Sequence, residues 1–253
     1  MTLAEYIQDV AKVILDSRKV VALTGDCISS ENKYPHFEPS QGLWRLVGPD
    51  SLKKDPSAFW RFQLEVIRVA LNAQPTRAHY ALAELERLGK LKSIITQSVD
   101  GLHLKAGSRN VIELYGNVRE ALCTNCGKVV PIEEVIIDIE GGTFPPRCRD
   151  CGNLLKTKVV LFNDQVPQGT LKKALYECKN CDLILVVGTS LRTYPATYLP
   201  VVAKLRGAKL VIMNSGPTPL DEVADVVVNA NLGDVLASIV MIVRETLRQR
   251  TST

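Results

Sequence analysis

Four cysteines carry the clearest chemical signal in this chain of 253 residues. They form two Cys-x-x-Cys pairs, Cys123 with Cys126 and Cys148 with Cys151, and each pair is followed by a turn-forming glycine, Gly127 or Gly152. The 21 residues between the pairs (127–147) come close to the roughly 15–20 of zinc ribbons. Two such pairs can present four thiolates to one tetrahedral zinc ion, and an all-cysteine site is closed and structural. The alternative is four buried cysteines that pack without a metal.

A third pair, Cys178 and Cys181, has the same spacing in a different setting. It ends a helical pattern and directly precedes an apolar segment, residues 182–187. No further pair remains to complete a metal site, so we predict packing in the core rather than metal or redox chemistry. The total of seven cysteines is odd, which argues against a framework of disulfides alone.

The elements that must position any site alternate between helix and strand. Apolar residues from Leu3 to Leu15 recur at helical spacing. Asp55-Pro56 predicts the start of a helix that reaches about Leu71, and Thr76 starts another, which Gly89 ends. Short apolar strands are predicted at 20–23, 93–95, 111–114, 159–162, 184–187, 210–213 and 226–228, with later helices near 168–180, 195–206 and 232–249. This alternation predicts an α/β fold with a parallel sheet covered on both faces.

Two stretches interrupt the alternation. Residues 31–74 hold a polar loop and a helix, and residues 120–156 hold the paired cysteines. We interpret both as insertions into one nucleotide-binding-type domain. In such sheets ligands bind beyond the carboxyl ends of the strands. Neither G-x-G-x-x-G nor a Walker A sequence is present, so the two commonest phosphate-binding motifs do not apply.

Composition narrows the class of protein. With 46% apolar and 23% charged residues, the chain is neither disordered nor of low complexity. A net charge of +4 is too small to indicate nucleic-acid binding, and Arg244, Arg248 and Arg250 with Glu245 predict a solvated helix face. We therefore expect no direct nucleic-acid partner. No apolar run approaches the ~18 residues of a membrane helix, and no signal-peptide pattern begins the chain, so a cytoplasmic protein is expected.

A series of motifs in one order resembles the sirtuins, which are NAD-dependent protein-lysine deacylases. The motifs include Ala22-Leu23-Thr24-Gly25 with Ile28-Ser29, Gly42-Leu43-Trp44, Thr96-Gln97 with Asp100-Gly101-Leu102-His103, the four cysteines, and Gly188-Thr189-Ser190-Leu191. The resemblance extends over nearly the whole chain. It implies a Rossmann-like parallel sheet and a smaller inserted domain made of a zinc ribbon and a helical module. NAD and an acyl-lysine peptide or protein partner are then expected in the cleft between them.

The resemblance also assigns segments and site residues. It implies a Rossmann-like domain of residues 1–37, 75–119 and 157–253, a helical module of residues 38–74 and a zinc-ribbon module of residues 120–156. The residues that it places around NAD are Gly25, Asp26, Cys27, Phe37, Gln97, Gly188, Thr189, Ser190, Asn214 and Leu232. It places Ser98, Asp100 and Tyr115 at the catalytic positions.

Several of these positions depart from the family pattern. The glycine-alanine-glycine after the first strand is Gly25-Asp26-Cys27 here. Glycine lets backbone N–H groups approach a phosphate closely, whereas Cys27 crowds that approach and Asp26 brings a carboxylate near the expected diphosphate. Glu38 stands where the family has an arginine. We expect these changes to weaken NAD binding.

The catalytic positions depart further. Ser98 replaces an asparagine that contacts the nicotinamide ribose, while Asp100 is retained. Tyr115 replaces the histidine that acts as general base on a ribose hydroxyl. A base works best with a pKa near the working pH, and tyrosine has a pKa of ~10 against ~6.5 for histidine. The nearby Asp26 and Glu38 are expected to raise the pKa of Tyr115 further.

Three hypotheses follow. The first is a sirtuin-fold protein that has lost deacylase chemistry, a pseudoenzyme that acts by binding a peptide, a protein or a nucleotide. The second is an active deacylase or ADP-ribosyl transferase of low or altered activity, motivated by Phe37, Gln97 and Asp100. The third is a nucleic-acid-binding or chromatin-associated subunit that uses the basic C-terminal helix.

Overall fold

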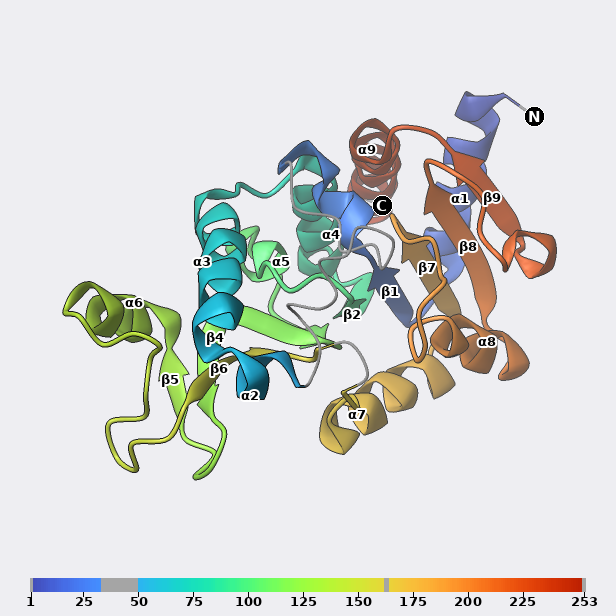
Figure 1. Ribbon diagram of the computed structural model, residues 1–253. Coiled ribbons are helices and arrows are strands. Elements are labelled where there is room, and N and C mark those ends of the chain that lie inside the picture. Colours follow the sequence, from blue (N-terminus) through green and yellow to red (C-terminus); the bar gives the residue numbers. More distant parts are fainter. Residues whose placement is uncertain (1, 33–49, 162–163, 252–253) are drawn as a thin grey trace.

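The computed structural model describes residues 2–32, 50–161 and 164–251, and its largest unit is a six-stranded parallel sheet (Figure 1). The strand order is β3-β2-β1-β7-β8-β9. The strands are β1 (Val20–Thr24), β2 (Leu91–Thr96), β3 (Val111–Glu113), β7 (Leu183–Val187), β8 (Lys209–Asn214) and β9 (Val226–Asn229). This is the order of doubly wound dinucleotide-binding folds, so the predicted α/β class and parallel sheet are confirmed.

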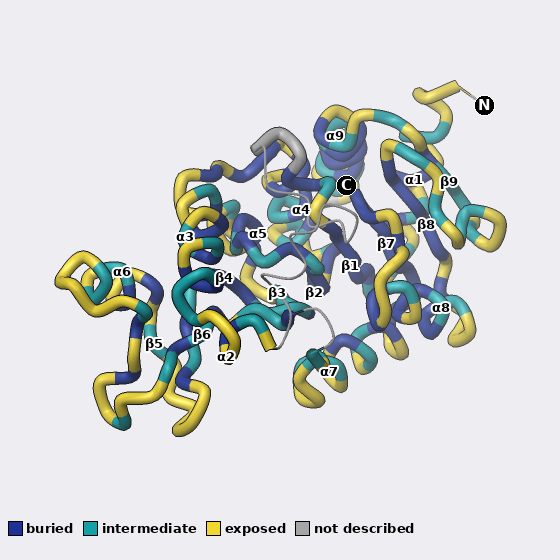
Figure 2. The backbone as a smooth tube through the Cα atoms, in the orientation of Figure 1, coloured by how far each residue is buried: buried dark blue, intermediate teal, exposed yellow. Residues whose placement is uncertain are grey.

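Helices cover both faces of this sheet because successive strand residues point to opposite sides. Val20 and Ala22 of β1 join one apolar cluster and Val21 and Leu23 join the other. The first cluster packs against α1 (Leu3–Asp16), α4 (Arg77–Arg87) and α9 (Leu232–Thr251), and the second against α7 (Gln168–Lys179) and α8 (Tyr198–Leu205). Figure 2 shows the central strands buried between these helices.

A second, smaller unit has its own sheet and core. Its antiparallel strands, in the order β5-β4-β6, are β4 (Gly116–Cys123), β5 (Val129–Pro131) and β6 (Leu155–Val159). The helices α2 (Ser51–Lys54), α3 (Pro56–Asn72) and α6 (Ile132–Glu140) contribute to the same apolar cluster. Trp60 of α3 is fully buried there, and its indole N–H donates to the Leu155 carbonyl at 2.8 Å. Burying a side chain of this size contributes roughly 1.5–3 kcal/mol.

Local signals set the helix ends as predicted. Asp55 caps α3 by accepting a hydrogen bond from the Ala58 N–H at 2.8 Å, with Pro56 at the first helical position. Thr76 caps α4, and Gly89 beyond its end has a φ of +76°. The remaining elements are short helices: η1 (Asp26–Asn32), α5 (Leu102–Lys105) and η4 (Asp221–Val223). No helix in the described part of the chain is long and apolar enough to cross a membrane.

One predicted strand is wrong. The apolar segment 159–162 was expected to belong to the parallel sheet, but the strand in this region is β6, and it pairs antiparallel with β4 in the smaller sheet. Val159 pairs with Gly116, and the Val160 N–H then donates to the Tyr115 carbonyl at 2.9 Å. β4 and β6 thus extend beyond residues 120–156 on both sides, while the domain boundaries themselves stay a prediction.

Candidate functional site

The candidate site lies where the strand order changes direction, between the carboxyl ends of β1 and β7, the position at which such folds bind ligands. Gly25 follows β1 and Gly188 follows β7, and the backbone joins them. The Gly25 N–H donates to the Val187 carbonyl at 3.2 Å, and the Cys27 N–H donates to the Gly188 carbonyl at 3.1 Å. Both loops are therefore fixed by main-chain contacts.

Glycine is required at both positions for physical reasons. A Cβ at Gly25 would lie 2.5 Å from the Cβ of Thr189. Gly188 has a φ of +61°, in the left-handed region, and a Cβ there would lie 2.8 Å from the Ile28 nitrogen. The two loops come this close because Gly25 and Gly188 themselves carry no side chain.

Asp26 and Cys27, the two residues that follow Gly25, differ in their exposure. Asp26 is exposed and lines a cavity that is also lined by Tyr115, whereas Cys27 is half-buried. Burial, followed by the charge of Asp26, raises the pKa of the Cys27 thiol. The thiol is therefore neutral near pH 7 and is not activated as a nucleophile.

The loop after β2 carries three candidate residues. The Gln97 side-chain N–H donates to the Thr189 hydroxyl at 2.7 Å, which joins this loop to the one after β7. Asp100 is buried, and one of its carboxylate oxygens accepts from the hydroxyls of Ser29 and Ser98, each at 2.7 Å. The Ser98 hydroxyl therefore points toward Asp100, at the position where the resemblance implies a ribose contact.

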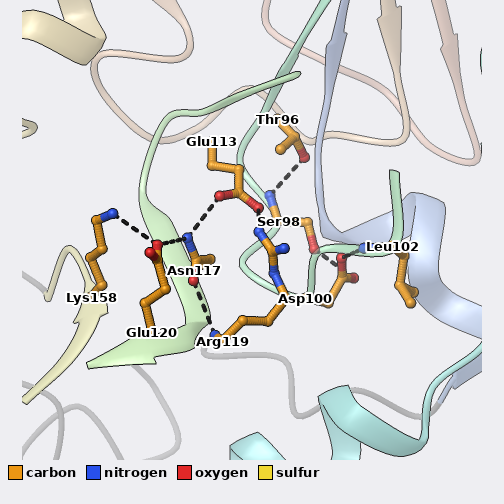
Figure 3. Close-up of polar contacts among 9 residues, drawn as sticks. All are labelled: Thr96, Ser98, Asp100, Leu102, Glu113, Asn117, Arg119, Glu120 and Lys158. Atoms are coloured by element: carbon orange, nitrogen blue, oxygen red, sulfur yellow. Dashed lines mark hydrogen bonds and ion pairs between the residues drawn. The ribbon is translucent and has the colours of Figure 1, made fainter. Parts of the chain in front are cut away.

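A polar network on β3 and β4 lies beside this loop (Figure 3). Arg119 pairs with Glu113 at 2.6 Å, and its backbone N–H donates to the Asn117 side chain at 3.0 Å. Gly101 has a φ of +75°, and a Cβ there would collide with the Arg119 guanidinium. Arg119 thus lies against the backbone next to Asp100 and helps to fix its position.

Two histidines lie beneath the site, with ring centroids 4.7 Å apart. His103 Nε2 lies 2.8 Å from the Thr24 hydroxyl, and His79 Nδ1 accepts from the Thr76 N–H at 3.1 Å. Burial lowers the pKa of His79 to about 4 and that of His103 to about 3. Both rings are neutral at pH 7, and their other ring nitrogens have no hydrogen-bond partner among the residues that the structure describes.

A cavity of about 750 Å³ opens in front of this loop, lined by Asp26, Gln63, Gln97, Tyr115, Arg192 and Tyr194 among others. Its volume is in the range of small-molecule and cofactor sites. The Tyr115 hydroxyl donates to the Tyr194 carbonyl at 3.4 Å. Burial is the largest influence and raises the pKa of Tyr115 to about 12. A hydrogen bond with the Ala196 backbone acts in the opposite direction, and the charge of Asp26 adds a smaller increase. The predicted effect of Asp26, which raises the pKa of Tyr115, is confirmed. Glu38, for which the same effect was predicted, lies outside the described residues.

The remaining sequence-predicted residues surround the same loops, except for Phe37, which lies outside the described residues. Ser190 is exposed beside Thr189, Asn214 ends β8, and Leu232 begins α9. A Cβ at Gly188 would lie 2.9 Å from the Leu232 side chain, so these two residues are in contact. The Asn214 side-chain oxygen is buried without a hydrogen-bond partner in the described part of the chain.

Sequence reasoning missed some of the residues that shape the site. Ser29 was part of a motif, but its contact with Asp100 was not predicted, and Gln63 was not considered as part of the cavity. The Thr76-x-x-His79 spacing resembles a capping box, with histidine in place of the usual glutamate. That spacing was the available signal for a fixed histidine under the site.

The four predicted zinc ligands are brought together in the smaller unit. All four Sγ atoms lie within 4.8 Å of one another, and Cys123 and Cys151 are 3.4 Å apart. Zinc–sulfur bonds of ~2.3 Å in a tetrahedron place sulfurs ~3.8 Å apart, so the donor set fits zinc. Gly127 and Gly152 both have a φ of +72°, as the two knuckle turns require. A bound zinc would crosslink the two knuckles, with no coordination position left for a reaction.

The third cysteine pair plays the packing role predicted for it. Cys178 and Cys181 are buried between α7 and the sheet. Burial raises their pKa values to about 12 and about 11. Both thiols are therefore neutral and belong to the core.

Together, the sheet order and the four-cysteine unit define a doubly wound domain of the nucleotide-binding type with an inserted zinc-ribbon module. A sequence model of the Sir2 family matches residues 25–195. The chain is 42% identical to "NAD-dependent protein deacylase 2" of Archaeoglobus fulgidus, over 93% of this chain and 95% of that protein. The chain belongs to the Sir2 family.

Solved structures agree with this assignment. A crystal structure described as a Sir2 homolog–NAD complex has a TM-score of 0.87 and 39% identity, covering 95% of this chain and 94% of the other. A structure described as Sir2–p53 peptide–NAD+ has a TM-score of 0.82 and 36% identity, covering 98% of this chain and 99% of the other. At these identities both the family and the arrangement of its two units are shared.

Proposed function

We propose that this Sir2-family protein binds NAD and an acyl-lysine segment of a partner protein in the cavity beside Tyr115, and that it deacylates that segment very slowly. Binding, rather than turnover, is then its principal activity. One observation carries the proposal: Tyr115, where the resemblance implies the general base, donates its hydroxyl to the Tyr194 carbonyl at 3.4 Å, and burial raises its pKa to about 12. A neutral phenol donates a hydrogen bond but does not take up a proton.

The binding half of the proposal rests on how the other groups are held. Gln97 and Thr189 join the loops after β2 and β7, and Asp100 is fixed by Ser29 and Ser98. Relatives of this chain are described as NAD-dependent deacylases, and similar structures hold NAD or a p53 peptide. Asp26 opposes a diphosphate, because two like charges ~4 Å apart at an effective dielectric of ~20 repel by about 4 kcal/mol. Its exposure lets the carboxylate turn toward solvent, which reduces that cost.

The test combines a binding and a turnover measurement on zinc-loaded protein. Calorimetric titration with NAD is expected to give a measurable heat, and an acetyl-lysine peptide with NAD is expected to yield deacetylated product at least ~100-fold more slowly than the Archaeoglobus relative assayed beside it. Comparable rates for the two proteins would refute the loss of turnover. Absence of heat at millimolar NAD would refute the cofactor part and leave peptide binding to be measured alone.

A deacylase or ADP-ribosyl transferase of low or altered activity is the second candidate. The positions of Gln97 and Asp100 favour it, because both side chains are held by neighbours that do not depend on Tyr115. NAD consumption within ~100-fold of the rate of the Archaeoglobus relative, with any of several acyl-lysine peptides, would support it over the first candidate. Consumption more than ~100-fold slower with all of them, from protein that binds NAD, would exclude it.

A further inference from the structure

The six-stranded sheet has one open edge that lies in a groove. β3 pairs with β2 alone among the described strands, so its other side carries no partner strand. The Ile94 N–H donates to the Asn110 carbonyl and the Leu114 N–H donates to the Thr96 carbonyl. In a parallel pair, alternate residues face the neighbour, so Val111 and Glu113 direct their N–H and C=O groups away from β2.

The helix α7 lies close to β3 (Figure 2). The groove between them has a volume of about 670 Å³ and is lined by the whole of β3, by Lys158 and by residues of α7. Tyr176 is 62% exposed and forms an aromatic wall, and Val111 and Ile112 are half-buried. An extended chain that entered the groove would thus meet both free backbone groups and apolar surface for alternate side chains.

The charges of the groove select its occupant. Its two carboxylates are already paired, Glu113 with Arg119 at 2.6 Å and Glu177 with Lys19 at 3.0 Å. Lys172 and Lys173 also line the groove, are exposed, and form no ion pair with any residue that the structure describes. The surplus charge is therefore positive, which complements an acidic ligand.

We propose that this groove binds an extended acidic segment of a partner protein, which adds as a strand to β3. Main-chain hydrogen bonds to Val111 and Glu113 supply the pairing, and Lys172 and Lys173 select acidic side chains. The groove adjoins the cavity beside Tyr115 and shares Val160 with it, but β3, Lys172 and Lys173 do not line that cavity, so this interaction does not depend on the proposed function of the cavity.

The test uses a defined probe, the peptide acetyl-Glu-Val-Glu-Val-Glu-amide, and the amide signals of isotope-labelled, zinc-loaded protein. We expect the probe to shift the amides of Val111 and Glu113 and to slow their hydrogen exchange. The same peptide N-methylated at every residue keeps its charge but loses the strand donors of both edges, and a glutamine version keeps the donors but loses the charge. Each of these control peptides is expected to bind at least ~10-fold more weakly.

Charge-reversal variants make the test specific to the groove. The double variant Lys172→Glu/Lys173→Glu is expected to weaken binding at least ~10-fold, whereas Lys53→Glu/Lys54→Glu, an exposed pair on α2, is expected to leave it unchanged. Equal binding by the N-methylated peptide would overturn strand addition, and equal binding by the Lys172/Lys173 variant would overturn the site. Self-association through β3, seen as amide shifts that depend on protein concentration without peptide, would overturn the choice of an acidic partner.

Discussion

Replacing Tyr115 with histidine is the sharpest perturbation of the site. At pH 7.5, a group with a pKa of about 12 is deprotonated in about one molecule in 30 000, whereas a histidine with a pKa of ~6.5 is about nine-tenths neutral and able to accept a proton. The fraction of molecules in the proton-accepting form is therefore about 3 × 10⁴ times larger with the histidine. The phenolate is the stronger base and reacts faster per molecule. If its rate advantage corresponds to about half of the difference in pKa, the net gain in kcat/KM for the histidine variant is on the order of 50-fold.

The surroundings of Tyr115 act in favour of this variant. The burial that raises the pKa of the phenol disfavours charge, so it lowers the pKa of a histidine placed there, while the Asp26 charge raises it. A histidine base is needed deprotonated, so the rate of the variant should rise with pH and level off near neutrality. Any phenolate-dependent rate of the unaltered protein should instead keep rising tenfold per pH unit toward pH 12.

The assay measures deacetylated peptide by mass spectrometry over this pH range, with NAD affinity determined by calorimetry for each variant. Tyr115→Phe is the matched control, since it keeps the ring and removes the hydroxyl; its rate at pH 7.5 measures the turnover that does not use the phenolate and should not exceed that of the unaltered protein. The reasoning is refuted if Tyr115→His binds NAD as tightly as the unaltered protein and yet turns over no faster. In that case the barrier lies elsewhere in the site, for example at Asp26 or Ser98.

Three further predictions concern the framework. Chelating zinc, or the variant Cys126→Ser, should lower the melting temperature and the zinc content together, while Cys178→Ala should leave the zinc content unchanged. Both Gly89 and Gly116 have a φ of +76°, so Gly89→Ala should lower the free energy of unfolding in urea by ~1–2 kcal/mol. Gly116→Ala should lower it further, because a Cβ at Gly116, but not at Gly89, would collide with the Lys158 carbonyl. The free energy of unfolding should fall as the pH drops from about 6.5 toward 4. The reason is that His79 and His103, with pKa values of about 4 and about 3 in the folded protein, take up protons first in the unfolded state. Urea unfolding at pH 7.5 and at pH 5 should show a loss on the order of 2 kcal/mol per histidine.

The parts of the fold that could be predicted are those set by local periodicity. α1, the parallel strands and the caps at Asp55 and Thr76 follow from spacing within one element, and each agrees with the structure. β4 was missed because residues 116–123 mix polar and apolar side chains without alternation, and its burial follows no period of two. The segment 159–162 was assigned to the wrong sheet because an apolar run does not identify its neighbour.

The site could be predicted in part for the same reason. Cysteine spacing is local, so the zinc ligands could be identified from sequence. The contact of Ser29 with Asp100 joins residues 71 positions apart. The Ser98 hydroxyl donates to the same carboxylate, so its direction also depends on where Asp100 lies. No spacing rule contains such contacts, because they arise only when the loops of several strands meet at one edge of the sheet.

The structure also separates the groups that hold the Sir2 framework from the groups that face the cavity. The loops after β1 and β7 are held by the backbone of Gly25, Cys27 and Gly188, and their approach excludes side chains at the two glycines. The side chains of Asp26 and Tyr115 take no part in those main-chain bonds and face the cavity instead. Substitution at these two positions therefore changes charge and proton affinity in the cavity while leaving its walls in place. For this reason a single change at Tyr115 tests chemistry separately from fold.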